Sequence, residues 1–109
     1  CAFWDLFAKA KELPLNKLLN TDSKNHISVY ASGINPSESY EKIKIARSMG
    51  IKAFKVKIGF NHSLDIDLLR SLDGYVTNEE MLMLDANQGW SIDEASKYLK
   101  ILENYFIKN

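Results

Sequence analysis

The sequence predicts an α/β fold in which parallel strands alternate with helices. Apolar, strand-like runs have their centres at Val29, Val56 and Leu84, so the pattern repeats every 27 or 28 residues. A loop rich in turn-forming residues and then an amphipathic helix pattern follow each run. Parallel strands need a crossover of about a dozen residues or more, usually a helix, so this spacing indicates strand–helix units joined in parallel.

The first half of the chain supplies a helix and then one strand–helix unit. Residues 2–11 are expected to form a helix that ends near Pro14, with Leu18 and Leu19 packed beside it. Residues 27–31 have the alternation of a strand, and residues 37–49 have the spacing of a helix. Gly50 follows as a natural helix terminator.

Two further units complete the chain. Strands are expected at residues 53–58 and 81–86, each followed by a helix. Asp65 and Asp67 fall in the first turn of the second crossover helix, where acidic side chains complement the helix dipole. Ser91 and Glu94 form a capping box that begins the third helix.

Three- and four-residue spacing predicts which faces of these helices are buried. The expected apolar positions are Tyr40, Ile43, Ala46 and Met49; then Leu64, Leu68, Leu69, Leu72 and Val76; then Ile92, Ala95, Leu99, Leu102 and Phe106.

Lys55 and Lys57 favour a barrel over an open sheet. Side chains alternate along a strand, so both lysines share the face opposite Phe54 and Val56. Under helices on both sides, two ammonium groups would be costly to bury. In a (β/α)₈ barrel they would point inward near the mouth where active sites form. The alternative is an edge strand on which lysines guard against aggregation.

The lysine pair also suggests chemistry. A like-charged neighbour lowers the pKa of a lysine and makes it a competent base near neutral pH. Asp85 and Asn87 repeat the two-residue spacing at the end of the next strand, and a carboxylate there suits Mg²⁺. An ordinary Asp-x-Asn turn is the alternative. Tyr30 and Ser32 have the parity to face the same interior and contact a substrate.

Composition excludes several classes of partner. The 109 residues carry fourteen basic and fourteen acidic side chains, which argues against binding to nucleic acid or to an anionic membrane. No apolar run approaches the roughly 20 residues that span a bilayer. Cys1 is the single cysteine, so a reducing, cytoplasmic location is expected.

These residues together resemble a known family. The sequence segments Phe3-Trp4-Asp5-Leu6, Val29-Tyr30-Ala31-Ser32, Phe54-Lys55-Val56-Lys57-Ile58-Gly59 and Leu84-Asp85-Ala86-Asn87-Gln88-Gly89-Trp90 are similar to the enolase superfamily. The resemblance is to its mandelate racemase/muconate lactonizing enzyme branch and covers essentially the whole chain.

The resemblance implies a Mg²⁺-dependent racemase, epimerase, cycloisomerase or dehydratase that removes the proton alpha to a carboxylate through an enediolate. Lys57 would be the general acid/base, while Lys55 would tune it and contact the substrate carboxylate. Asp85 would be the first metal ligand, with Asn87 beside it. A small-molecule carboxylate is the implied substrate.

The resemblance also implies an incomplete enzyme. Residues 1–24 would be a helix and linker from the capping region, and residues 25–109 the first three strand–helix units of the (β/α)₈ barrel. Such a fragment is expected to be inactive alone and to self-associate or swap through its open sheet edges. Two alternatives remain: a Schiff-base aldolase barrel that uses Lys57, and a non-catalytic αβ module for binding or assembly.

Overall fold

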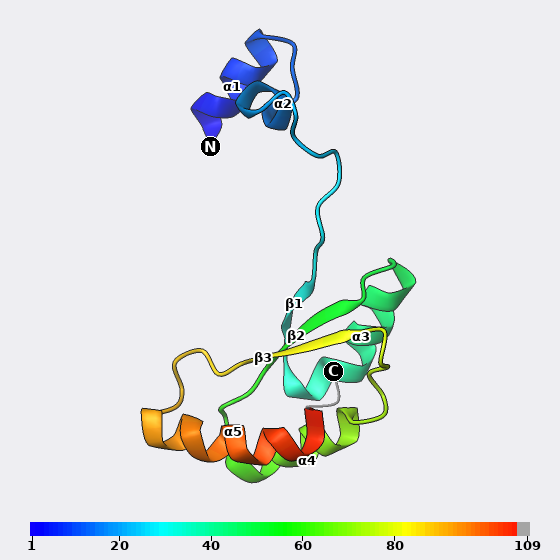
Figure 1. Cartoon of the computed structure of the whole chain (residues 1–109), viewed down its shortest axis with the longest axis vertical. Helices are drawn as coiled ribbons and strands as arrows, with labels where there is room; N and C mark the ends of the chain where they lie inside the picture. The colour runs from blue at the N-terminus through cyan, green and yellow to red at the C-terminus, as the bar shows by residue number, and fades with distance from the viewer. Residues whose placement is uncertain (107–109) are drawn as a thin grey trace.

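The computed structural model describes residues 1–106 as a three-stranded αβ unit preceded by a pair of helices (Figure 1). The elements in chain order are α1 (Ala2–Ala10), α2 (Leu15–Leu19), β1 (Ala31–Ile34), the 3₁₀ turn η1 (Pro36–Glu38), α3 (Ser39–Ser48), β2 (Ala53–Lys57), α4 (His62–Leu72), β3 (Met81–Asp85) and α5 (Ile92–Phe106).

The strands form a single parallel sheet in the order β1-β2-β3. Lys55 pairs with Met83 and Lys57 pairs with Asp85 across the β2–β3 ladder. Between β1 and β2 the register shifts after Ala31, where a bulge places Ser32 and Gly33 opposite a shorter stretch of β2. The α/β class and the alternating order of strands and helices are therefore confirmed.

The first strand lies later in the chain than the sequence predicts. Residues 27–30 are extended without pairing, and β1 begins at Ala31. The reason is the position of the neighbouring strand, because β2 begins at Ala53 and Ala31 already pairs with Phe54. Ile27 and Val29 consequently remain exposed despite their strand-like alternation.

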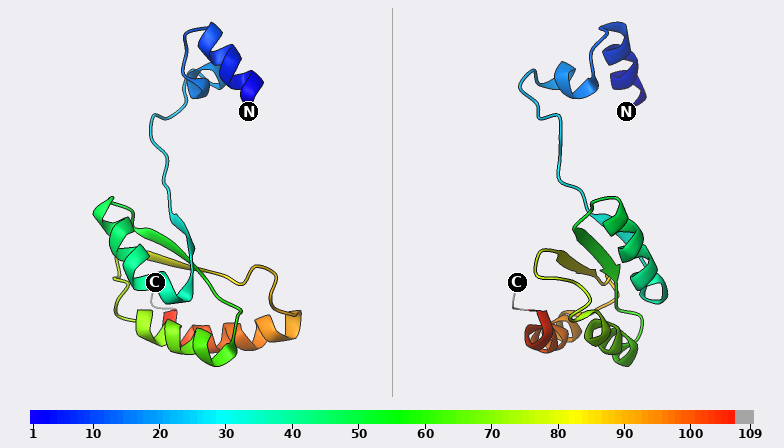
Figure 2. Two further views of the ribbon diagram at one scale, coloured as in Figure 1. Left: turned by 180° about the vertical axis from the view of Figure 1, so that it is seen from behind. Right: turned by 90° about the vertical axis from the view of Figure 1, so that its right-hand side faces the viewer.

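The core lies on one face of the sheet. Phe54 and Val56 of β2 are fully buried against Ile43 of α3 and Leu72 of α4. The crossover helices gather on this side, and α5 runs beside α4 (Figure 2). The described helices leave the opposite face of β2, which carries the lysines, uncovered.

Several predicted helix faces are wrong in detail. Tyr40, Met49, Leu64, Ile92 and Leu99 are exposed rather than buried. In α5, Tyr98 is buried instead of Leu99. Tyr98 stacks on Trp90 of the preceding loop, so the helix turns a different side toward the core than the sequence predicts. The side chain of Phe106 lies outside the described residues.

A partly buried ion pair fixes the end of the sheet at which the strands begin. The guanidinium of Arg47 donates to both carboxylate oxygens of Glu80, at 2.6 and 2.7 Å, and to the carbonyl of Tyr75. It also lies 4.5 Å from the centre of the Tyr75 ring. These contacts tie α3 to the segment that leads into β3.

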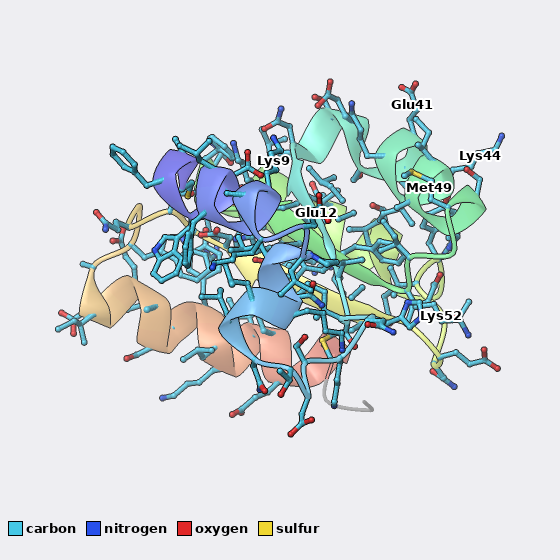
Figure 3. All side chains as sticks on the ribbon, turned by 90° about the horizontal axis from the view of Figure 1, so that it is seen from above. Lys9, Glu12, Glu41, Lys44, Met49 and Lys52 are labelled. Carbon is cyan, nitrogen blue, oxygen red and sulfur yellow. The ribbon has the colours of Figure 1, made fainter. Side chains whose placement is uncertain are left out.

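The first two helices stand apart from the sheet, and an extended segment joins them to it (Figure 1). Leu18 is half-buried as predicted, whereas Leu19 is exposed. Seen from above, Glu41 and Lys44 project outward from α3 (Figure 3), as expected for a solvated surface. Within residues 1–106, none of the helices has the length and apolar character to cross a membrane.

Candidate active site

The candidate site occupies the uncovered face of the sheet, at the end where the strands finish. Residues of β2 alternate between half-buried and fully buried, with Phe54 and Val56 toward the core and Lys55 and Lys57 on the other face. Because directly paired residues of parallel strands share a face, Asp85 lies on the lysine face beside Lys57. Since β2 is the central strand, the edge-strand explanation for the lysines is wrong.

Lys55 forms the main electrostatic contact of this face. Its ammonium nitrogen lies 3.1 Å from a carboxylate oxygen of Asp85, and both side chains are about one-third exposed. The same ammonium lies 5.5 Å from the centre of the Tyr30 ring. Hydrogen bonding to Asp85 and then the charge interaction with Tyr30 raise the pKa of Lys55. The expectation that a like-charged neighbour lowers it is therefore wrong for Lys55.

Asp85 is held as a carboxylate. One of its oxygens accepts a hydrogen bond from the backbone N–H of Asn87 at 2.9 Å, and the other faces Lys55. The Asn87 hydrogen bond is the largest cause of the lowered pKa of Asp85, followed by the contact with Lys55. Lys57 contributes to the same direction through its charge.

Asn87 takes a turn conformation rather than a strand conformation. Its φ is +47°, and its side-chain amide lies 3.4 Å from the backbone carbonyl of Asp85. The segment is thus an Asp-x-Asn turn and also lies at the candidate site, so the turn interpretation and the site interpretation describe the same geometry. Ser32 is exposed on β1, where the bulge separates it from the paired positions.

The oxygen atoms at this site match the ligands that Mg²⁺ prefers, but they are few. Asp85 supplies one carboxylate, and Asn87 supplies an amide next to it. Among the side chains that the structure describes, those of residues 1–103, no three acidic, histidine or cysteine groups lie together so as to hold a metal ion. The donor chemistry therefore suits a hard cation for which this segment provides one charged ligand.

Sequence reasoning missed a buried carboxylate behind the site. Asp65 is 1% exposed, and one of its oxygens accepts the backbone N–H of Gly59 at 2.8 Å. It was expected only to complement the dipole of α4. The signal was present in the spacing, because Asp65 shares the four- and seven-residue repeat of Leu69 and Leu72 and hence the buried face of the helix.

Comparison with known proteins identifies the family. A family model described as enolase C-terminal domain-like matches residues 38–108. The chain is 35% identical over 107 residues to L-Ala-D/L-Glu epimerase of Francisella tularensis subsp. novicida, covering 95% of this chain and 30% of that protein. It is 34% identical over 108 residues to L-Ala-D/L-Glu epimerase of Clostridium acetobutylicum, with 98% and 30% covered. The chain thus spans about 30% of the length of these curated relatives.

Solved structures agree in fold. A mandelate racemase/muconate lactonizing enzyme from Bordetella bronchiseptica RB50 superposes with a TM-score of 0.80 at 34% identity, over 91% of this chain and 27% of that one. A dipeptide epimerase from Enterococcus faecalis V583 gives 0.76 at 29% identity, over 94% and 30%. The sheet is accordingly part of a (β/α)₈ barrel. The chain belongs to the enolase C-terminal domain-like family, within its mandelate racemase and muconate lactonizing enzyme branch.

Proposed function

We propose that this chain supplies part of the active site of an epimerase that removes the proton alpha to a substrate carboxylate. One observation carries the proposal: Lys55, Lys57 and Asp85 share one uncovered face toward the carboxyl ends of the adjacent strands β2 and β3. This is the end of a (β/α)₈ barrel at which active sites are built. Relatives named as epimerases, a dehydratase and a cycloisomerase support an isomerase or lyase for the whole protein.

Lys57 is the residue that transfers the proton in this proposal. Lys55 is held as an ammonium by its contact with Asp85, which raises its pKa and makes it a poor base. Lys57 is the last residue of β2, on the same face as Asp85 and in register with it. A base at the strand end can reach a substrate bound across the mouth of the barrel.

Lys55 has a complementary role. A cation held at a fixed place stabilises negative charge on a substrate carboxylate as the alpha proton leaves. The Asp85 contact and the Tyr30 ring keep the ammonium of Lys55 at the site, where the substrate carboxylate would find it. Asn87 and Ser32 are proposed as further substrate contacts at the rim.

Mg²⁺ is the proposed cofactor, and Asp85 is the residue of this chain that would bind it. When bound, a divalent cation neutralises charge that develops on the substrate carboxylate. Asp85 is a carboxylate at neutral pH, and the hydrogen bond from Asn87 and then the contact with Lys55 lower its pKa further. The remaining ligands would come from parts of the protein beyond these residues.

The substrate class that we propose is a dipeptide. The curated relatives in the comparison include proteins named for L-Ala-D/L-Glu and for hydrophobic dipeptides. In this proposal Lys55 binds the substrate carboxylate and Lys57 removes the alpha proton. Dipeptides share both groups with amino acids and hydroxy acids. Selection among these compounds is expected to depend on residues outside this chain.

Proton exchange in D₂O tests the proposal. The full-length protein that contains this chain would be incubated with L-Ala-L-Glu, with other dipeptides and with mandelate, each with MgCl₂ or with EDTA. We expect ¹H NMR to show loss of one alpha-proton signal with MgCl₂ and retention with EDTA. Absence of exchange in every compound would contradict the proposal, and metal-independent trapping of a carbonyl substrate by borohydride would favour the Schiff-base alternative.

A further inference from the structure

We propose that Asp65 is a positioning residue, which fixes the end of the lysine strand against the loop that carries Asn87 and thereby sets the place of Lys57. The inference rests on the proposed function of Lys57. Asp65 is buried on α4, on the side of the sheet opposite the uncovered face that carries Lys55 and Lys57. Its effect on the reaction would therefore act through the backbone.

The carboxylate of Asp65 holds the backbone directly after β2. Its Oδ2 accepts the N–H of Gly59, two residues after Lys57, at 2.8 Å. Asp65 is 1% exposed, so this hydrogen bond is shielded from water. Asn61 caps the same helix by accepting the N–H groups of Ser63 and Leu64, which fixes the short loop between Gly59 and α4.

Gly59 in turn lies against the loop that follows β3. Its φ is +88°, and a Cβ atom placed there would lie 3.2 Å from the indole nitrogen of Trp90 and 3.3 Å from the carbonyl oxygen of Ala86. Gly89 closes the contact from the other side, since a Cβ atom on it would lie 3.3 Å from the Gly59 carbonyl oxygen. The two loops therefore touch with no room for a side chain between them.

Two further contacts connect the loop after β2 with the loop after β3 and with α5. The N–H of Ile58 donates to the carbonyl of Asp85 at 3.0 Å, which continues the ladder past Lys57. Tyr98 of α5 is buried and stacks on Trp90 with ring centres 4.2 Å apart. Burial and then the nearby charge of Asp65 raise the pKa of Tyr98, so the Asp65 carboxylate lies close to Tyr98.

Removing the Asp65 carboxylate would leave the N–H of Gly59 buried without its acceptor. The loop would move to satisfy that group, because a buried donor without a partner is costly. Such a shift would change the separation of Lys57 from Asp85. A displacement of about 1 Å in an active site can reduce the rate about a hundredfold.

The test compares Asp65→Ala with Asp67→Ala in the full-length protein. Asp67 is a matched control because it is on the same helix, carries the same charge and is exposed. We expect Asp65→Ala to lower kcat about 10- to 100-fold with little change in KM, and Asp67→Ala to match the wild type. Amide NMR signals of Gly59 and Asn87 should shift in Asp65→Ala and remain in place in Asp67→Ala.

Each outcome decides the inference. Equal kcat in the two variants would overturn it, as would an Asn87 signal that does not move in Asp65→Ala. If Asp65→Ala does not fold, Asp65→Leu and Asp67→Leu replace the pair, because leucine fills the space of the side chain but cannot accept the N–H of Gly59, and equal rates again contradict the proposal. If the wild type exchanges no alpha proton, the proposed function fails by itself. The Asn87 signal then still decides whether Asp65 positions the loop.

Discussion

Neutralising Glu80 should destabilise the fold in a pH-dependent way. The hydrogen bond from Arg47 is the largest influence on the Glu80 carboxyl and lowers its pKa. Burial raises the pKa, and the N–H of Thr77 lowers it, so that the pKa of Glu80 falls from 4.5 to about 2. Glu80 is 8% exposed in its side chain and Arg47 is 29% exposed. The pKa difference converts to about 3 kcal/mol at most. Solvent screening at Arg47 reduces the expected contribution to about 1–2 kcal/mol.

The sign of the pH dependence follows from the direction of the pKa change. A carboxyl with a lowered pKa in the folded state adds stability above its unfolded pKa, near 4.5, and loses it as the pH falls toward 2. Wild type and Glu80→Gln would be compared by urea unfolding at pH 7, 4.5 and 3. The difference in unfolding free energy should be full at pH 7 and smaller at pH 3.

Glu79 provides the matched control. It is adjacent in sequence and pairs with Lys52, but both side chains are largely exposed. Exposed pairs contribute little to stability, so Glu79→Gln should change the unfolding free energy by well under about 1 kcal/mol. Equal effects of the two substitutions, or a Glu80→Gln effect that stays constant down to pH 3, would refute the reasoning.

Three further predictions concern the loops and the site. Gly59→Ala should destabilise the protein more than Gly50→Ala by thermal unfolding, since both have positive φ but only Gly59 has neighbours within 4 Å; equal losses would contradict this contact. Asp85→Asn should lower the pKa of Lys55 toward its ordinary value in an NMR titration, because Asp85 is the largest cause of the raised pKa; an unchanged titration would argue against the ion pair. Ser91→Ala should cost about 1 kcal/mol in urea unfolding because the capping box of α5 is lost; no loss would show that the cap is dispensable.

The lysine face could be predicted from sequence because it depends on one strand alone. Alternation along β2 assigns Phe54 and Val56 to the core and Lys55 and Lys57 to the other face, whatever the neighbours are. The capping box of α5 was predictable for the same reason. Its partners, Ser91 and Glu94, lie three residues apart in sequence.

The ion pair between Lys55 and Asp85 could not be predicted. The sequence places both residues on the inner face, but the partner of each charge depends on the register of two strands about thirty residues apart. The raised pKa of Lys55 depends on that register. A neighbouring lysine, which is visible in the sequence, indicates the opposite direction.

The starting point of β1 and the buried face of α5 depend on packing partners. Ile27 and Val29 have strand-like alternation, but no strand lies opposite them. In α5, the stack of Tyr98 on Trp90 determines which side is buried, and Ile92 and Leu99 are left outward. Local spacing defines an apolar stripe, whereas the neighbouring loop decides how the helix is rotated.

The most direct test of the central claim compares Lys57→Ala with Lys52→Ala in the full-length protein. Lys52 is exposed directly before the first residue of β2, at the end opposite Lys57, so it controls for loss of charge. Alpha-proton exchange of an active dipeptide would be followed by ¹H NMR in D₂O with MgCl₂. We predict that exchange by Lys57→Ala falls at least about a hundredfold while Lys52→Ala retains the wild-type rate. Exchange that persists without Lys57 would contradict its assignment as the residue that transfers the proton.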